Sequence, residues 1–166
     1  MSEDRLYQLA ERVGETLKAR GLMLATAESC TGGGVGEAIT RVAGSSDWFE
    51  RGFITYTYIS KREMLGVSSD TLGAHGAVSE PTVREMVSGV LERSHAQVAL
   101  AVSGTAGPGG GTSDKPVGTV CFAWGVKDGA ATSETRHFAG DRESVRKQSV
   151  MHALNGVLRL LEKTTH

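Results

Sequence analysis

Residues 22–42 read LMLATAESCTGGGVGEAITRV and predict a strand, a glycine-rich loop and a helix in direct succession. The apolar run from Leu22 to Ala27 is typical of a strand that is buried on both faces. The spacing of Val35, Ile39 and Val42 places these residues on one face of a helix. Strands that alternate with helices in this way indicate the α/β class.

The chain on either side of this stretch predicts further helices and strands. An amphipathic helix precedes it, because Leu6, Leu9, Val13 and Leu17 share one helical face and Gly21 follows as a stop signal. Downstream we expect strands at FITYT (53–57) and VALAV (98–102), and helices at SKREMLG (60–66) and SEPTVREMVSGVLERS (79–94). The turn signal Asp128-Gly129 joins a further strand pair at TVCFAWGV (119–126) and ATSETRHF (131–138). A final helix follows, and Ser79 and Asp141 are the expected helix caps.

No internal repeat or linker interrupts this order, so we expect residues 1–166 to form a single domain. The predicted architecture has three layers, α/β/α, with a mixed, mostly parallel sheet between two layers of helices. Ligand sites in such sheets lie beyond the carboxyl ends of the strands. Both glycine-rich loops, ESCTGGG (28–34) and SGTAGPGGGTSDKPVG (103–118), follow predicted strands and are expected at that edge.

The composition argues against several classes of protein. The chain has 18 lysines and arginines against 19 aspartates and glutamates, which disfavours broad electrostatic binding to nucleic acid or an anionic membrane. The sequence has no apolar signal segment and no apolar run long enough to span a membrane. The two cysteines form no metal-type pair, and the carboxylates Glu28, Glu80 and Asp114 lie in three separate loops. We therefore expect a cytoplasmic protein without a metal or other cofactor.

The first glycine-rich loop offers a candidate nucleophile in Ser29. A strand, loop and helix in succession expose a hydroxyl and direct backbone N–H groups at an anion, which suits a serine and its oxyanion hole. The same spacing also fits a simple helix cap by Ser29 or Thr31. The GxSxG elbow of α/β-hydrolases and the GxxxxGK[ST] motif of P-loop kinases are both absent. Cys30 is expected to be a small packed thiol.

A nucleophilic serine needs a base, and Lys61 is a candidate because it follows the next predicted strand. A lysine must lose roughly 3 pKa units to accept a proton at neutral pH, through burial and nearby cations. Arg142 or Arg146 would supply the cationic repulsion. The competing interpretation of Lys61 is an exposed charge at the start of a helix.

The histidines and aromatic residues each allow two roles. His75 and His137 are possible bases, although surface or structural roles are expected for all five histidines. Tyr56 either relays a proton or packs in the core. Trp48 and Phe49 either anchor their loop or contribute to a subunit interface.

The second glycine-rich loop and the last helix offer ligands for an anion. Residues 107–111, GPGGG, allow a close backbone approach, and Lys115 lies just beyond them. Arg142 and Arg146 share one face of the last helix. With this loop they would hold a phosphate, or they are simply solvated.

These motifs together resemble those of one family. The segments that carry the resemblance are TAESCTGG (26–33), GSSDWFERGFITY (44–56), Lys61, HGAVSE (75–80), SGTAGPGGGTSDKPVGTV (103–120) and GDRESVR (140–146). They resemble the CinA C-terminal domain family in its stand-alone, PncC-type form, in order from about residue 6 to about residue 160. Nothing before the first predicted helix resembles the larger N-terminal domain of full-length CinA proteins.

The resemblance implies an enzyme that hydrolyses the carboxamide of nicotinamide mononucleotide (NMN) to nicotinate mononucleotide and ammonia, in pyridine-nucleotide (NAD) recycling and without a metal. By position, Ser29 matches the family's catalytic serine, Lys61 its general base and Tyr56 the tyrosine beside them. The positions matched to substrate binding are Thr31, Gly32 and Gly33 at the reacting carbonyl, and Ser103, Gly104, Thr105, Gly107, Gly109 and Arg142 in the nucleotide pocket. A homodimer or higher oligomer is also implied.

One segment departs from the family pattern. Where the family reads YSNEAK, residues 56–61 read YTYISK, so Tyr58 replaces an amide and Ile59 replaces an acid. Thr105 also replaces an apolar residue. Two further functions therefore stay open: a nucleotide-binding or regulatory module that has lost catalysis, and an amidohydrolase for a related pyridine amide.

Overall fold

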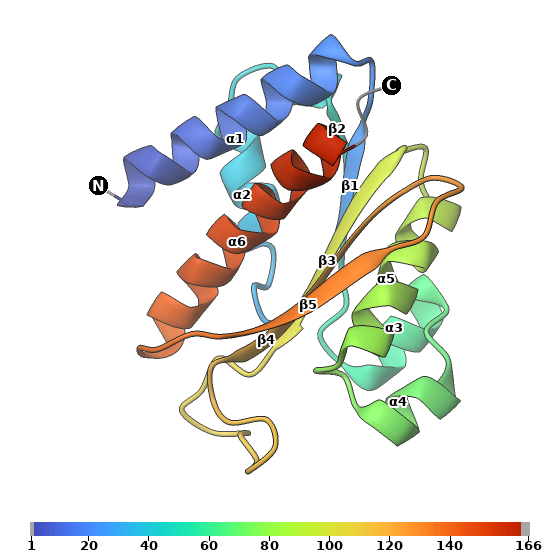
Figure 1. Ribbon diagram of the computed structural model, residues 1–166, viewed down its shortest axis with the longest axis vertical. Coiled ribbons are helices and arrows are strands. Elements are labelled where there is room, and N and C mark those ends of the chain that lie inside the picture. Colours follow the sequence, from blue (N-terminus) through green and yellow to red (C-terminus); the bar gives the residue numbers. More distant parts are fainter. Residues whose placement is uncertain (1, 164–166) are drawn as a thin grey trace.

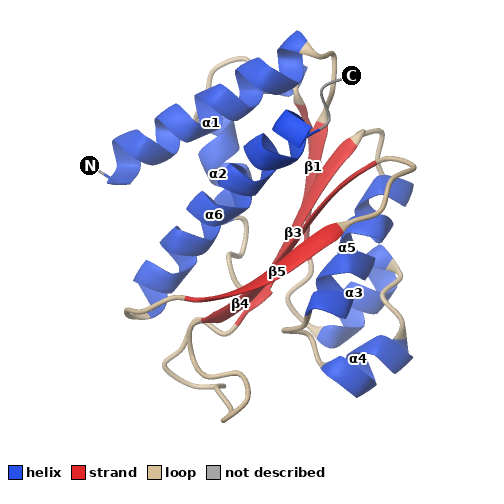
Figure 2. Ribbon diagram, in the orientation of Figure 1, coloured by secondary structure: helices blue, strands red, loops and turns tan. Residues whose placement is uncertain are grey.

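A five-stranded sheet lies at the centre of the computed structural model, which describes residues 2–163 (Figure 1, Figure 2). The strands lie side by side in the order β2-β1-β3-β4-β5. Their bounds are Leu24–Glu28 for β1, Phe49–Ile54 for β2, Val98–Gly104 for β3, Thr119–Val126 for β4 and Thr132–His137 for β5. The helices are α1 (Ser2–Ala19), α2 (Gly34–Thr40), α3 (Tyr58–Leu65), α4 (Ser69–His75), α5 (Glu80–Glu92) and α6 (Arg142–Lys163), with a 3₁₀ turn at Ser45–Asp47.

The directions of the strands confirm the predicted mixed sheet. Strand β1 pairs in parallel with both β2 and β3, whereas β4 pairs antiparallel with both β3 and β5. Among the described strands only β4 is reversed, so the other four run in one direction. The carboxyl ends of β1, β2 and β3 therefore meet at one edge of the sheet, where the two glycine-rich loops begin.

Two layers of helices cover the sheet, with α1, α2 and α6 on one face and α3, α4 and α5 on the other (Figure 1). Alternation along β3 supplies both cores, because Leu100 and Val102 face the first layer while Ala99 and Ala101 face the second. Helices α3 and α5 approach each other closely at Gly89. A Cβ atom there would lie 2.1 Å from the carbonyl oxygen of the last residue of α3, so only glycine fits.

Two elements differ from the prediction. Strand β2 covers residues 49–54 rather than 53–57, because a capping box starts α3 immediately afterwards. Thr57 Oγ1 accepts the N–H of Ser60, and Ser60 Oγ accepts the N–H of Thr57. Helix α4 was not predicted, since its seven residues bury only Leu72 and show no apolar period.

Three local signals are confirmed by the structure. Asp128 adopts a φ of 66° in the turn between β4 and β5, a conformation that aspartate tolerates better than most residues. Ser79 Oγ accepts the N–H of Thr82 at the start of α5. Asp141 Oδ1 accepts the N–H of Ser144 at the start of α6. These contacts are the N-terminal caps expected from the sequence.

Trp48 anchors the segment before β2 in the core. It is 3% exposed, and it packs so closely on α1 that a Cβ atom at Gly14 would lie 2.4 Å from the indole ring. Phe49 is partly buried against the same core. Of the two roles considered for this pair, the loop anchor fits the structure.

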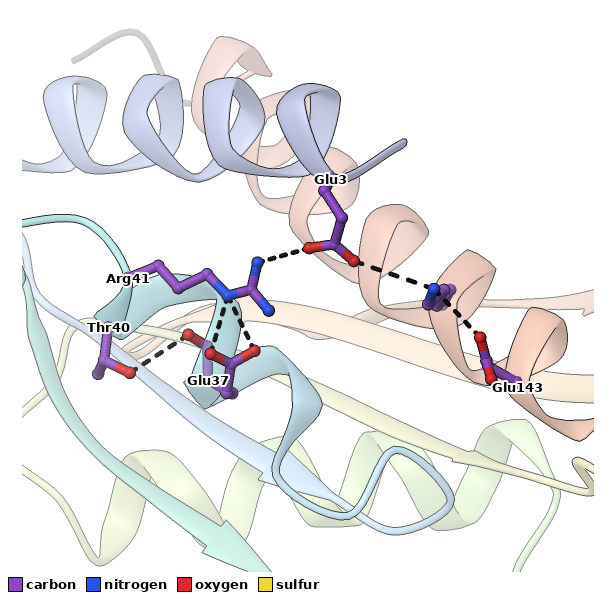
Figure 3. Close-up of polar contacts among 6 residues, drawn as sticks. Glu3, Glu37, Thr40, Arg41 and Glu143 are labelled. Atoms are coloured by element: carbon purple, nitrogen blue, oxygen red, sulfur yellow. Dashed lines mark hydrogen bonds and ion pairs between the residues drawn. The ribbon is translucent and has the colours of Figure 1, made fainter. Parts of the chain in front are cut away.

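A surface network joins α1 to α2 and α6 (Figure 3). Arg41, which directly follows α2, binds Glu37 of α2 and Glu3 of α1. Lys147 of α6 lies 3.9 Å from Glu3 and 3.3 Å from Glu143. Exposed ion pairs stabilise by less than about 1 kcal/mol each, so this network adds little to the packing of the three helices. Within residues 2–163, no helix is both long and apolar enough to span a membrane.

Candidate active site

Ser29 lies at the carboxyl end of β1, between the ends of β2 and β3. Its N–H donates to the Val102 carbonyl of β3 at 3.0 Å. On the other side, the N–H of Thr55 donates to the Glu28 carbonyl at 2.8 Å. These two bonds continue the parallel pairing beyond the strands and fix the backbone of Ser29. The residue is 7% exposed.

Lys61 approaches Ser29 from helix α3. The capping box at Thr57 sets the start of α3, so that Lys61 and Leu65, four residues apart, share its buried face. Lys61 Nζ lies 3.0 Å from Ser29 Oγ and donates a hydrogen bond to the Thr55 carbonyl at 2.7 Å. Because the lysine is 1% exposed, the interpretation of Lys61 as an exposed charge at a helix start is wrong.

Burial lowers the pKa of Lys61 to about 8, because low-polarity surroundings disfavour the charged ammonium. The neighbouring Cys30 acts weakly in the opposite direction. Neither Arg142 nor Arg146 contributes to the shift, so the expected cationic repulsion is corrected to burial alone. A lysine with this pKa is partly neutral near pH 7, and a neutral amine is able to accept a hydroxyl proton.

A pocket of about 260 Å³ opens beside Ser29 and Lys61. It brings together eight of the predicted site residues: Ser29, Tyr56, Lys61, Ser103, Gly104, Thr105, Gly109 and Arg142. The sequence interpretation missed Ala77, Val78 and the wall position of Cys30. The lining residues Ala106 and Gly110 belong to the second glycine-rich loop, which was expected at this site. Small apolar residues and backbone contacts such as the Thr55 carbonyl carry no chemical signal in a sequence.

Arg142 links the start of α6 to the second glycine-rich loop and to Tyr56. Its guanidinium donates to the Gly107 carbonyl at 2.9 Å and to the Tyr56 hydroxyl at 3.0 Å. Tyr56 is 58% exposed, so the expectation that it packs in the core is wrong. In the described part of the chain, no hydrogen bond joins its hydroxyl to Ser29 or Lys61. Gly107 contributes its carbonyl to Arg142 and does not itself line the pocket.

The structure corrects the expected contact of Thr31, Gly32 and Gly33 with a substrate carbonyl. None of the three lines the pocket. The N–H of Gly32 donates to the Ser29 carbonyl at 3.0 Å, and the N–H of Gly33 donates to Glu28 Oε1 at 3.2 Å. The Thr31 hydroxyl donates to the same carboxylate oxygen. These donors are therefore already occupied within the loop.

A neighbouring cavity of about 580 Å³ contains the other candidates, His75, His137 and Lys115, together with the second cysteine, Cys121. Burial raises the pKa of the Cys121 thiol, which disfavours a nucleophilic thiolate. His137 Nδ1 lies 3.2 Å from the Thr119 hydroxyl, and Lys115 Nζ donates to the His75 carbonyl. The Thr119 hydroxyl beside His137 already donates to the Pro116 carbonyl at 2.6 Å, so its proton is not directed at the imidazole. His166 lies outside the described residues.

Cys30 is a buried thiol, as expected. Burial raises its pKa to about 11, so it stays protonated at neutral pH and does not compete with Ser29 as a nucleophile. Among residues 2–163, no group of three or more histidine, cysteine, aspartate or glutamate side chains is arranged to hold a metal ion.

Comparisons with known proteins find relatives that match nearly the whole chain. Residues 6–161 match the family described as the CinA C-terminal domain. The chain is 52% identical over 159 residues to the nicotinamide-nucleotide amidohydrolase PncC of Enterobacter agglomerans, covering 96% of this chain and 97% of that one. It is 53% identical over 158 residues to the protein of the same name from Pseudomonas putida, covering 95% and 98%.

Solved structures agree with these sequence matches. The competence/damage inducible protein CihA from Agrobacterium tumefaciens matches with a TM-score of 0.90 and 44% sequence identity, covering 93% of this chain and 94% of that one. The five-stranded fold of this chain is thus the fold of an experimentally determined relative.

Proposed function

The chain belongs to the CinA C-terminal domain family, and on this premise we propose that it is an amidohydrolase that converts NMN to nicotinate mononucleotide and ammonia in pyridine-nucleotide recycling. The observation that carries the proposal is the 3.0 Å contact between Lys61 Nζ and Ser29 Oγ in a lined pocket. A buried lysine against a serine hydroxyl is the arrangement that a serine nucleophile with a lysine base requires. The names of the relatives supply the substrate.

The chemistry proceeds in two halves. Neutral Lys61 accepts the Ser29 proton while Ser29 Oγ attacks the carboxamide carbon. The protonated lysine returns that proton to the departing nitrogen, so ammonia leaves and an acyl-serine remains. Water then attacks the acyl-serine with Lys61 again as base, which releases nicotinate mononucleotide and restores both side chains. General base catalysis of this kind contributes about 10²–10⁴-fold.

The oxyanion that forms on the substrate carbonyl needs donors other than the N–H groups of Gly32 and Gly33. The N–H of Cys30 follows the nucleophile directly and has no oxygen acceptor among the described residues. The residue after the nucleophile supplies an oxyanion donor in other serine hydrolases. We assign the same role to Cys30, and one such donor contributes about 3 kcal/mol.

The remaining walls suit the rest of the nucleotide. Ala77, Val78 and Ala106 offer small apolar surfaces for the flat pyridine ring. Arg142 supplies a positive charge at the pocket wall, where a phosphate would bind. Its hydrogen bond to the Tyr56 hydroxyl supports a role for Tyr56 in orienting this arginine rather than in relaying protons.

Of the three departures from the family pattern, Thr105 lines the pocket, whereas Tyr58 and Ile59 lie away from it. Tyr58 and Ile59 are 53% and 57% exposed on α3, and neither lines the pocket. Their position favours the amidohydrolase over a module that has lost catalysis. An amidohydrolase for another pyridine amide, and a homodimer or higher oligomer, stay predictions that substrate comparison and the mass of the particle in solution would test.

The test is product formation from NMN by the purified wild type beside Ser29→Ala. We expect ammonia and nicotinate mononucleotide in equal amounts from the wild type and neither from the variant, with NMN binding retained. Saturable binding of NMN without product from the wild type would instead favour the binding module. Faster turnover of nicotinamide riboside, which lacks the phosphate, would favour the related pyridine amide.

A further inference from the structure

The loop that carries the nucleophile, residues 29–33 and called here the serine loop, is held from two sides by groups of opposite charge. We propose that Glu28 and Arg146 are positioning residues that keep Ser29 in line with Lys61. This inference rests on the proposed function for the roles of Ser29 and Lys61. Its experiment is chosen so that the two proposals fail in different ways.

On the inner side, the Glu28 carboxylate gathers the hydrogen-bond donors of the loop. It is 2% exposed, and its Oε1 accepts the Thr31 hydroxyl and the N–H groups of Gly33 at 3.2 Å and Val35 at 2.9 Å. Its Oε2 accepts the N–H of Gly36 at 3.0 Å. A buried carboxylate is tolerated only when such bonds replace its hydration. Two of these four donors lie in the serine loop and two in the first turn of α2, so the carboxylate ties the loop to the helix.

On the outer side, Arg146 of α6 gathers the acceptors. Its Nε donates to the Cys30 carbonyl at 3.1 Å, and a terminal nitrogen donates to the Thr31 carbonyl at 3.2 Å. A Cβ atom at Gly32 would lie 3.4 Å from the same guanidinium, which is an ordinary van der Waals distance. The planar guanidinium thus binds two consecutive carbonyls at once, which the single ammonium of a lysine does less well.

Between these two groups the serine loop has little freedom. The N–H of Gly32 closes a turn onto the Ser29 carbonyl at 3.0 Å, and the N–H of Gly34 donates to the Thr31 carbonyl at 2.9 Å. Neither Glu28 nor Arg146 lines the 260 Å³ pocket. Both therefore act on the position of Ser29 without touching the substrate, and they are expected to affect kcat rather than KM.

The central variant is Arg146→Met, because Arg146 lies on the exposed side of α6 and its removal leaves the core intact. The matched control is Lys147→Met, which removes the next cation of α6, whose contacts are Glu3 and Glu143 on the surface. We expect Arg146→Met to lower kcat by about 10- to 100-fold with KM changed by less than about threefold, since a shift of about 1 Å costs up to about 100-fold. Lys147→Met should behave as the wild type.

The pH profile separates positioning from electrostatics. If Arg146 only positions Ser29, the variant lowers the plateau of kcat/KM and leaves its midpoint where the wild type has it. If Arg146 instead repels the Lys61 ammonium, its loss raises that midpoint, and this result would overturn the proposal. Wild-type kcat in Arg146→Met would overturn it as well.

A second readout does not depend on NMN. Phenylmethanesulfonyl fluoride transfers its sulfonyl group to a reactive serine oxygen with loss of fluoride, while the serine proton passes to the base. The rate of this labelling, followed by intact mass with Ser29→Ala as the blank, should fall in Arg146→Met as kcat does. Slow labelling of the variant beside normal labelling of a wild type that does not deamidate NMN would leave the positioning role standing and remove the proposed function. Equal labelling of the variant and of a wild type that deamidates NMN would remove the positioning role and leave the proposed function standing.

If Arg146→Met does not fold, the more conservative variant Arg146→Lys tests the same proposal. A lysine reaches one of the two carbonyls, so its labelling rate should lie between those of the wild type and Arg146→Met. A folded Arg146→Lys protein, verified by its thermal unfolding midpoint, that labels at the wild-type rate would overturn the proposal.

Discussion

Replacing Lys61 by methionine separates the catalytic role of this side chain from its effect on stability. Methionine keeps an unbranched chain of similar length in the same buried space but has no proton to exchange. We expect NMN turnover to fall by at least about 1000-fold, because the nucleophile loses its base. Binding of NMN should persist, since the pocket walls stay intact.

The magnitude of the stability effect follows from the buried amine. Burial lowers the pKa of Lys61 to about 8 in the folded protein, against 10.5 in the unfolded chain. That gap corresponds to about 3 kcal/mol of folding free energy, at about 1.4 kcal/mol per pKa unit. Between these two pH values the unfolded chain holds a proton that the folded protein has released, so wild-type stability rises with pH in this window. Methionine does not titrate, so at this position Lys61→Met lacks the rise in stability with pH.

The assay is thermal unfolding of wild type and Lys61→Met from pH 7 to pH 10.5, followed by circular dichroism. At pH 7 the variant should be more stable than the wild type. By pH 10.5 the free energy of unfolding of the variant, relative to that of the wild type, should have fallen by about 3 kcal/mol. For a chain of this size this corresponds to about 10 °C in the difference between the two midpoints. Lys147→Met, which removes an exposed lysine, should show a constant difference from the wild type.

Two results would refute this reasoning. A difference between Lys61→Met and wild type that stays constant across the pH range would mean that Lys61 is not an unfavourably buried charge. Turnover of NMN near the wild-type rate in Lys61→Met would remove Lys61 as the base, whatever its effect on stability.

Three further outcomes are expected. The kcat/KM of the wild type should rise about tenfold between pH 7 and pH 9, because the neutral fraction of Lys61 grows over that range, and a flat profile in an ammonia-release assay would contradict the assignment. Gly89→Ala should lower the unfolding midpoint and the turnover together, because its methyl group would lie 2.1 Å from a carbonyl oxygen of α3. Gly73→Ala, on the open side of α4, should leave both values at or above those of the wild type. Tyr58→Phe removes the hydroxyl that accepts the N–H of Ala77 at 3.2 Å, so KM for NMN should rise about fivefold with little change in kcat, and an unchanged KM in steady-state kinetics would show that this contact does not shape the pocket.

The sequence predicted the elements that have a continuous apolar run or a regular apolar spacing. The apolar run at 98–102 became β3 with both faces buried, and the helix at 79–94 became α5 with its serine cap. Helix α4 was missed because it buries one leucine, and the second strand was placed too late because an edge strand with the burial of β2 shows weak alternation. Capping and turn signals are local, so Asp128 and Asp141 were identified from their neighbours alone.

The sequence by itself determined the α/β class and the family resemblance, and it identified eight of the residues that line the pocket, because these follow from local patterns and motifs. Only the tertiary structure decided what those residues contact. The packing of α3 on α5 buries Lys61 against Ser29 and lowers its pKa. The N–H groups of Gly32 and Gly33, which were expected to face a substrate, donate instead to the Ser29 carbonyl and to Glu28 Oε1. Burial and distances between residues far apart in the chain are set by how helices and strands pack, and no local pattern encodes them.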